Sequence, residues 1–286
     1  MRPAAAAREA ADLVKFAHTV FALPFALISA MAAAGGVPRG EVLGWIVLAM
    51  AGARTAAMAF NRLADHASDA ANPRTSGRGL PAGRVGRGFA WALVVSGAGA
   101  LLVAAWRLNP LCLALAPIAL AWVLGYSYSK RFTPLSHLWL GAGLAIAPVG
   151  AWLAVRGSFA VPPLVLAAAV TAWVAGFDVL YSLQDEAFDR SAGLFSLPAR
   201  IGAARAVVAA RALHGTAALG FAAFAALIGG WGLWAGLAAA VALLAWQHAL
   251  VGPGRLERLN TAFFTANGAL SVLMLALYFL DIMARA

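Results

Sequence analysis

The chain has 286 residues, of which 63% are hydrophobic and only 11% are charged, whereas an ordinary globular domain carries roughly 25% charged residues. A water-soluble fold of this length needs far more charge to cover its surface. The composition therefore excludes a cytosolic enzyme, a secreted disulfide scaffold and a disordered chain. Together with a mean hydropathy of +0.83, it indicates a polytopic membrane protein.

Apolar runs long enough to span a bilayer as a helix, about 20 residues each, recur nine times along the chain. The predicted helices cover residues 17–36, 42–60, 88–106, 110–126, 135–155, 161–180, 204–228, 231–250 and 260–282. Basic residues precede the first run, as in a signal peptide, but the run is too long for a signal-peptide core and the next span follows at once. We therefore expect an all-α membrane protein with nine transmembrane helices.

Lysine and arginine residues concentrate on one side of these predicted helices. Sixteen of the 21 lie before the first helix (Arg2, Arg8 and Lys15) or after helices 2, 4, 6 and 8, and four lie on the opposite side. Cytoplasmic loops carry the excess of basic residues in membrane proteins. The N-terminus and these loops are thus predicted to be cytoplasmic. The net charge of +10 is then a topology signal, and we expect no nucleic-acid partner.

The two long polar segments on this predicted cytoplasmic side resemble each other. Residues 61–87 and 181–203 each contain two aspartates four residues apart, and each continues into a Leu-Pro-Ala tripeptide. The two aspartate pairs, offset by 120 residues, are Asp65 with Asp69 and Asp185 with Asp189. Aligned features at one offset indicate a diverged internal repeat of four helices, in which each polar loop follows the second helix of its repeat.

The aspartates fall where apolar helices reach the cytoplasmic interface, and helical spacing groups them into two stripes. Residues three, four or seven apart share a helix face. The stripes consist of Asn61, Asp65 and Asp69, and of Asp178, Tyr181, Asp185 and Asp189. Pro73 disfavours continuation of the first helix beyond Asn72.

Converging carboxylates are costly unless a cation neutralises them, and this predicts a metal site. Magnesium takes oxygen ligands, typically one or two carboxylates together with substrate phosphates. We therefore expect both aspartate pairs, Asp65 with Asp69 and Asp185 with Asp189, to hold Mg²⁺ and a diphosphate. The alternative is that these charges only solvate helix ends.

Basic residues near the stripes are candidate diphosphate ligands. Arg74 and Arg78 follow the first aspartate pair, and Lys130 follows the fourth helix, four residues after Tyr126. Lysine binds phosphate as a mobile point charge and arginine as a bidentate fork. The alternative is that they only contribute to the cytoplasmic excess of positive charge.

Arg54 lies inside the second predicted helix, where a charge costs at least about 2.5 kcal/mol unless it faces a cavity or a partner. It precedes Asn61 by seven residues and so shares its stripe, about 10 Å deeper in the membrane. A cation at that depth fits the carboxylate of an aromatic acid beneath a diphosphate. The alternative is a salt bridge to one of the aspartates.

The two acidic motifs resemble those of the UbiA family of intramembrane prenyltransferases. The family's Asn-x3-Asp-x3-Asp motif is present at residues 61–69, and its Asp-x2-Tyr-x3-Asp-x3-Asp motif at residues 178–189. Arg62 departs from the pattern, since many members carry an aspartate there. The wider segments resemble the bacterial 4-hydroxybenzoate polyprenyltransferase branch. The resemblance covers residues 1–286 as a single domain, and it implies two four-helix-type repeats around a central cavity with a cytoplasmic cap.

The resemblance also implies a mechanism in a bacterial inner membrane. The four aspartates of the two pairs would bind Mg²⁺, supported by Asn61, while Arg74, Arg78 and Lys130 hold the diphosphate. The allylic C–O bond of a polyprenyl diphosphate then ionises, and a ring carbon ortho to a phenol attacks. Tyr126 and Tyr181 would stabilise the carbocation or position the diphosphate. The base that removes the ring proton is open, with Asp178 as one candidate.

The acceptor and one other function class also stay open. The resemblance points first to 4-hydroxybenzoate in respiratory quinone biosynthesis, with 1,4-dihydroxy-6-naphthoate of the futalosine menaquinone route as the alternative. Both are hydroxylated aromatic acids, so Arg54 fits either. A membrane transporter is the remaining alternative, because repeats and intramembrane charges also mark carriers. However, both acidic motifs lie at one face rather than at the midplane.

Overall fold

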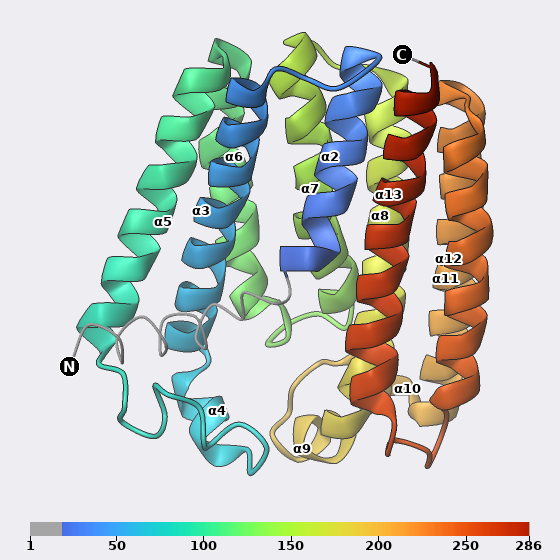
Figure 1. Cartoon of the computed structure of the whole chain (residues 1–286). Coiled ribbons are helices and arrows are strands. Elements are labelled where there is room, and N and C mark those ends of the chain that lie inside the picture. Colours follow the sequence, from blue (N-terminus) through green and yellow to red (C-terminus); the bar gives the residue numbers. More distant parts are fainter. Residues whose placement is uncertain (1–18, 286) are drawn as a thin grey trace. The chain divides into compact units, whose positions relative to one another are not determined.

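The computed structural model describes residues 19–285, and the regular elements in this range are helices (Figure 1). Arg2, Arg8, Lys15 and the predicted cytoplasmic N-terminus lie outside the described residues. The helices are α2 (Thr19–Ala34), α3 (Gly40–Ala64), α4 (His66–Ala71), α5 (Arg87–Leu108), α6 (Pro110–Ser129), α7 (Ser136–Arg156), α8 (Val161–Ser182), α9 (Glu186–Ser191), α10 (Leu197–Ile201), α11 (Ala203–Ile228), α12 (Trp231–Leu250) and α13 (Asn267–Arg285). A 3₁₀ turn, Leu183–Asp185, leads into α9, and a π-helical segment, Thr261–Ala266, leads into α13.

The predicted all-α membrane fold is confirmed. Within the described range, eight helices are long and apolar enough to cross a membrane, and α2 is a shorter apolar helix. These correspond in order to the nine predicted spans, and α2 ends at Ala34, two residues before the predicted end. The chain is thus an integral membrane protein.

The chain forms two compact units. The first contains residues 44–128 with α4, α5, α6 and most of α3, and the second contains residues 20–43 together with the chain from Ser129 onward. The division does not follow the predicted repeat boundary, because α2 packs with α7, α8 and α11 rather than with the helices that follow it directly.

In the first unit, α3 and α5 meet at two glycines. A β-carbon built on Gly52 lies 2.6 Å from the carbonyl oxygen of Gly97, and a β-carbon on Gly97 lies equally close to the carbonyl oxygen of Gly52. The two backbones are therefore in direct contact, a packing mode that small residues permit in membranes. Beyond α4 the chain folds back, and Leu80 and Val85 are buried against α3 and α5.

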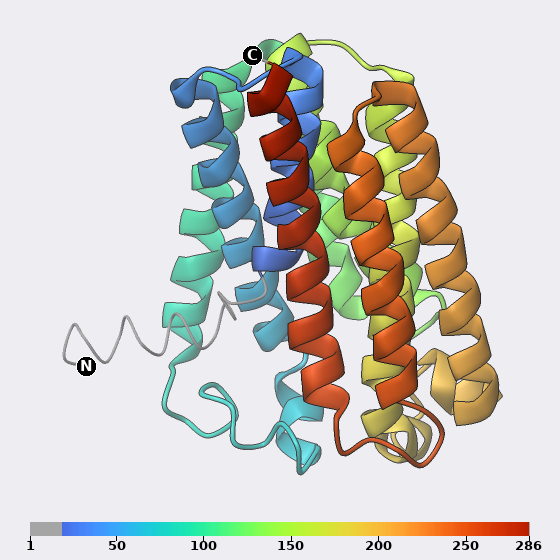
Figure 2. The ribbon, with the colours of Figure 1, turned by 45° about the vertical axis from the view of Figure 1, so that its right-hand side comes forward.

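In the second unit, α8 packs against α7 and α11. Gly141 of α7 lies against the backbone of Thr171, and Gly220 of α11 lies against Ala169. Small residues thus bring both neighbours close to α8. Figure 2 shows α11, α12 and α13 side by side in the same unit.

Aromatic packing explains why α2 belongs to the second unit. The Phe25 ring lies 5.1 Å from Trp173 of α8 and stacks on Phe221 of α11 at 5.4 Å, centroid to centroid. Phe21 contacts Phe263 of the π-helical segment at 5.5 Å. These rings are buried, so α2 supplies part of the core around α8. Aromatic pairs of this kind contribute about 0.5–1.5 kcal/mol beyond their buried area.

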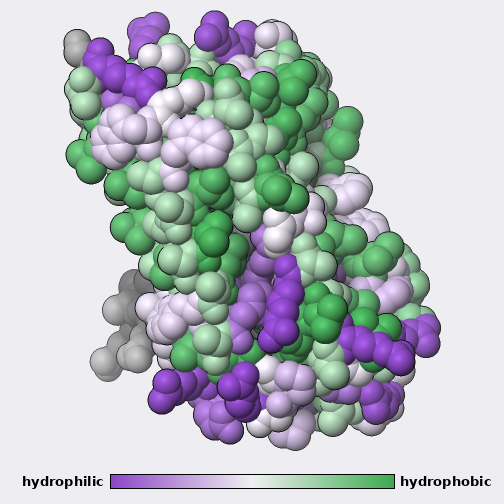
Figure 3. Space-filling model, turned by 90° about the vertical axis from the view of Figure 1, so that its right-hand side faces the viewer, coloured by the Kyte–Doolittle hydropathy of each residue, from purple (hydrophilic) through white to green (hydrophobic). Residues whose placement is uncertain are grey.

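The outer surface of the second unit is apolar across its middle. Figure 3 shows hydrophobic side chains over most of this face, with hydrophilic ones toward the two ends and one hydrophilic group just below the middle. Leu219 and Val208 of α11 are 74% and 62% exposed. Trp231 and Trp234 are exposed at one end of α12, and Trp246 near the other. Tryptophan at both ends of an apolar span is typical of the two membrane interfaces.

Candidate functional site

Both helices that carry an acidic motif break at the first aspartate of the pair. Asp65 stands between α3 and α4 with φ −94° and ψ 8°. Asp185 stands between α8 and α9, at the end of the 3₁₀ turn, with φ −102° and ψ 2°. Both values lie in the bridge region, where many active-site residues are found. The sequence placed each stripe on one helix, whereas the structure divides each of these helices at the first aspartate of its pair.

The break has the same consequence in both units. Asp65 and Asp185 each precede a six-residue helix, and neither carboxylate caps the helix it precedes. The second aspartates, Asp69 and Asp189, lie at the same position of these short helices and are buried. Equivalent backbone geometry at equivalent positions supports the internal repeat. Asn72, before Pro73, is extended and ends α4, as predicted.

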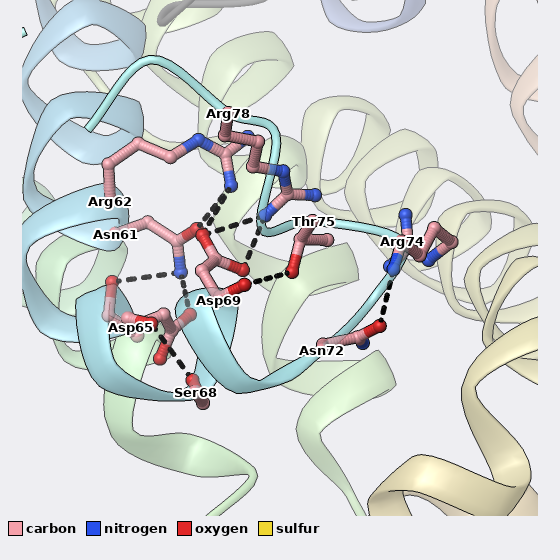
Figure 4. A network of polar contacts seen from close by, with 10 residues as sticks. Asn61, Arg62, Asp65, Ser68, Asp69, Asn72, Arg74, Thr75 and Arg78 are labelled. Carbon is pink, nitrogen blue, oxygen red and sulfur yellow. Dashed lines mark hydrogen bonds and ion pairs between the residues drawn. The ribbon is translucent and has the colours of Figure 1, made fainter. Parts of the chain in front are cut away.

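The first aspartate pair belongs to a dense polar network (Figure 4). Asn61 Nδ2 donates to Asp65 Oδ2 over 2.8 Å, which confirms that these two residues share a face. The same amide lies 3.5 Å from Ser127 Oγ, so the end of α6, next to Tyr126, reaches the motif. Ser68 Oγ donates to the Asp65 carbonyl oxygen.

Two arginines converge on Asp69. Arg78 Nη1 donates to both carboxylate oxygens, over 2.7 and 2.9 Å, and Arg62 Nη1 lies 3.7 Å from Oδ2. Arg78, a predicted diphosphate ligand, is therefore also the partner of Asp69. Arg62 was not among the predicted site residues, although its departure from the family motif was a signal. The two positive charges balance those of Asp65 and Asp69.

The remaining candidates of the first unit lie around this network. The Arg74 amide donates to Asn72 Oδ1 over 3.0 Å, and the Arg74 side chain is turned away from the aspartate pair (Figure 4). Arg54 is half-buried on α3, which runs without interruption to Asn61, as predicted. Tyr126 is half-buried on α6, one residue before Ser127.

In the second unit, Lys130 faces the second aspartate pair. Its Nζ atom lies 3.6 Å from Asp189 Oδ2, a buried oxygen that accepts no hydrogen bond. The Phe195 amide donates to the Lys130 carbonyl oxygen over 2.7 Å, which fixes the segment before α7 against the one before α10. The structure thus brings together Lys130 and Asp189, two predicted site residues 59 positions apart.

Tyr181 and Asp178 lie on α8 ahead of the second pair. The Tyr181 ring is 4.2 Å from Phe263, centroid to centroid, and continues the aromatic row of Trp173 and Phe177. Asp178 Oδ2 lies 2.6 Å from Nδ1 of His137. Nothing in the sequence marked His137, since a single histidine at the start of an apolar helix is more often a core residue.

The donor set fits a magnesium ion. Among residues 19–285, no three histidine, cysteine, aspartate or glutamate side chains gather closely enough to hold a metal ion by themselves. Each motif instead supplies two carboxylates, and Mg²⁺ takes one or two of these together with substrate phosphates. The buried Asp189 Oδ2 has Lys130 at 3.6 Å but accepts no hydrogen bond, so its lone pairs are available to such an ion.

Comparisons with known proteins agree with this geometry. The sequence model of the UbiA prenyltransferase family matches residues 22–271. A protein of Alkalilimnicola ehrlichii named 4-hydroxybenzoate octaprenyltransferase is 32% identical over 82% of this chain and 80% of its own length. The protein of that name from Neisseria meningitidis is 30% identical over 82% and 79%.

Solved structures share the fold. A UbiA homologue from Aeropyrum pernix, in its apo form, is 34% identical and covers 92% of this chain and 98% of its own, with a TM-score of 0.85. A UbiA homologue from Archaeoglobus fulgidus, bound to DMAPP and Mg²⁺, has the same fold with a TM-score of 0.75 over 96% of this chain and 99% of its own, at 20% identity. With two matching acidic motifs, a family match over most of its length and a close structural relative, the chain belongs to the UbiA prenyltransferase family and is a prenyltransferase of the membrane.

Proposed function

We propose that this enzyme transfers a polyprenyl group from polyprenyl diphosphate to a hydroxylated aromatic acid, first of all 4-hydroxybenzoate, in respiratory quinone biosynthesis. The observation that carries the proposal is the pair of equivalent aspartate sites, each facing a basic side chain: Asp69 with Arg78, and Asp189 with Lys130. The relatives named 4-hydroxybenzoate octaprenyltransferase support the acceptor. The enzyme acts at the cytoplasmic face of a bacterial inner membrane, where the basic loops lie.

Metal binding is part of this proposal. Asp65, Asp69, Asp185 and Asp189 hold Mg²⁺, and Asn61 fixes the Asp65 carboxylate through its amide. Bound Mg²⁺ offsets the negative charge that develops on the departing diphosphate. The Archaeoglobus fulgidus homologue bound to DMAPP and Mg²⁺ supports this assignment.

The basic residues act on the same leaving group. The Lys130 side chain is 32% exposed beside Asp189, so it reaches diphosphate oxygens without leaving its carboxylate partner. Arg78 and the exposed Arg74 add positive charge at the first pair. Donors already in place where charge develops lower the barrier to ionisation of the allylic C–O bond.

The acceptor is held and activated by other groups of the chain. Arg54 binds the carboxylate of the aromatic acid from within α3, and the ring carbon ortho to the phenol attacks the allylic cation. Tyr181, in its row of aromatic rings, and Tyr126 present π-faces, and such faces stabilise cations.

A product assay tests the proposal. Purified protein in detergent is mixed with Mg²⁺, geranyl diphosphate and either 4-hydroxybenzoate or 1,4-dihydroxy-6-naphthoate, and the products are identified by mass spectrometry. We expect prenylated 4-hydroxybenzoate, and none when EDTA removes the metal. A prenylated naphthoate instead would assign the enzyme to menaquinone biosynthesis. Product formation in EDTA would contradict the metal assignment, and no product with either acceptor would contradict the proposed acceptor class.

A further inference from the structure

His137 is a buried histidine that touches the second acidic motif from outside it. It is the second residue of α7 and is 2% exposed. Its Nδ1 lies 2.6 Å from Asp178 Oδ2, and its Nε2 accepts a hydrogen bond from the Leu197 amide over 3.2 Å. The ring therefore connects α7 to α8 and to the first turn of α10.

These two contacts determine which nitrogen carries the proton. A backbone amide can only donate, so Nε2 of His137 must be the unprotonated nitrogen. Nδ1 then carries the hydrogen and donates it to Asp178 Oδ2. A neutral histidine held in one tautomer by its two neighbours orients a carboxylate in a fixed direction.

The contact with His137 covers only one side of the Asp178 carboxylate. The Asp178 side chain is 16% exposed, against 3% for that of His137. Asp178 lies on α8 three residues before Tyr181, so the two residues share a face of this helix. The carboxylate is thus held by His137 at Oδ2 and is less deeply buried than the ring that holds it.

We propose that His137 is a positioning residue that holds Asp178 as the proton acceptor of prenyl transfer, an inference that rests on the proposed function. When the ring carbon ortho to the phenol bonds to the allylic carbon, it carries both the new C–C bond and its original hydrogen. Asp178 Oδ1 takes this hydrogen as a proton, and the electron pair of the C–H bond restores the aromatic ring. Asp178, now a neutral acid, passes the proton to water as the product leaves.

A kinetic isotope effect tests the proton transfer directly. The acceptor is 4-hydroxybenzoate with deuterium at both positions ortho to the hydroxyl, and kcat is compared with that of the unlabelled acid at saturation. With Asp178 in place, proton loss is fast and the isotope effect is near unity. In Asp178→Asn, proton loss becomes slow, so kcat falls by about 100-fold or more and the isotope effect rises well above unity. The KM for geranyl diphosphate stays unchanged.

Two substitutions of His137 separate positioning from structural support. The amide nitrogen of His137→Asn occupies the place of Nδ1 and keeps a donor for Asp178. The longer side chain of His137→Gln reaches the place of Nε2 and keeps the contact with Leu197, but it loses Asp178. We expect His137→Asn to retain an isotope effect near unity, and His137→Gln to show the raised isotope effect of Asp178→Asn.

The outcomes distinguish this inference from the proposed function. Gel filtration and retained binding of geranyl diphosphate establish that each variant is folded. An isotope effect near unity in folded His137→Gln overturns the inference, as does a raised effect in His137→Asn but not in His137→Gln. If the wild type prenylates only the naphthoate, the deuterium is placed on that ring. A wild type that prenylates neither acid overturns the proposed function and this inference with it.

Discussion

Asp69 and Asp189 are buried carboxylates, and each lies beside basic groups of its own unit. Asp69 binds Arg78 and has Arg62 nearby, whereas Asp189 has Lys130 at 3.6 Å. Removing one partner of a buried charge pair is costly, because the other charge remains buried alone. A substitution of an aspartate in either pair therefore needs a control, namely the equivalent substitution of a nearby acidic residue outside the proposed site. Glu186, next to Asp185 and paired with the exposed Arg190, provides one.

We expect Asp185→Asn to lower kcat by at least about 100-fold, because it removes a charge that acts on the leaving group. Glu186→Gln breaks an exposed pair worth at most about 1 kcal/mol, so we expect its kcat to stay close to that of the wild type. The product assay measures both. Equal losses in the two variants would show that the effect comes from the local acidic charge and not from Asp185 itself.

Arg54→Gln tests the acceptor site. A lost hydrogen bond to a charged group costs about 1.5–3 kcal/mol, so we expect the KM for 4-hydroxybenzoate to rise at least tenfold while the KM for geranyl diphosphate is unchanged. Steady-state kinetics with each substrate varied in turn measures this. A rise in the KM for geranyl diphosphate instead would support the alternative in which Arg54 serves an aspartate.

Local spacing in the sequence correctly predicted that Asn61 and Asp65 share a helix face. Asn61, Asp65 and Asp69 lie four residues apart, and that spacing is visible in any single sequence. His137 contacts Asp178 across 41 residues and Leu197 across 60. Such contacts depend on how the helices pack against one another, and this packing cannot be read from the periodicity of a single helix. Arg62 was missed for another reason, because its positive charge was already explained by membrane topology.

At the scale of the helix, packing of α3 against α5 depends on two residues without a side chain. Gly52 and Gly97 face each other backbone to backbone, whereas a β-carbon placed on Gly99, on the same helix as Gly97, would meet no neighbouring atom within 4 Å. The contact lies near the middle of α3, the helix that carries Asn61. Substitution at the two α5 glycines thus separates a packing effect from a change in helix propensity.

We expect Gly97→Leu to destabilise the protein by about 1–3 kcal/mol, because overpacking pushes the two helices apart. Gly99→Leu makes the same chemical change where there is space, and we expect no loss of stability. Thermal unfolding in detergent measures both. A lower unfolding temperature for Gly99→Leu than for Gly97→Leu would contradict the close contact between α3 and α5.

The same scale shows what helical periodicity conceals. Apolar runs predicted the helices to within a few residues, and Pro73 correctly predicted the end of α4. The breaks at Asp65 and Asp185 were not predicted, because the four-residue spacing of the aspartates is the same with or without a break. The Asp69 amide still donates to the Asp65 carbonyl oxygen, as in an unbroken helix. A change in one residue's backbone angles leaves no trace in residue spacing.

At the scale of the whole molecule, the distribution of basic residues predicts the orientation of the chain in the membrane. Sixteen lysine and arginine residues belong to one predicted side and four to the other. Ser76 lies in the segment between α4 and α5, and Ser158 lies between α7 and α8, and both are exposed. The two serines are therefore suitable reporters of the two sides.

We expect a cysteine at position 158, in a Cys112→Ser background, to react with a membrane-impermeant maleimide in intact spheroplasts. A cysteine at position 76 should react only after the membrane is opened, because the basic segment around it is retained in the cytoplasm. Gel-shift labelling measures both. The reverse labelling pattern would place the aspartate pairs on the outer face and contradict the proposed orientation.

The position of α2 in the second unit has a consequence for biogenesis. Phe25 emerges from the ribosome well over a hundred residues before Trp173 and Phe221, the rings on which it packs. During synthesis α2 is therefore without these packing partners while α3, α5 and α6 are made. The apolar side chains of α2 are compatible with lipid during this interval. The core of the second unit can form only after α8 and α11 have been synthesised. Assembly of the second unit is therefore a late event, completed when α8 and α11 pack on α2.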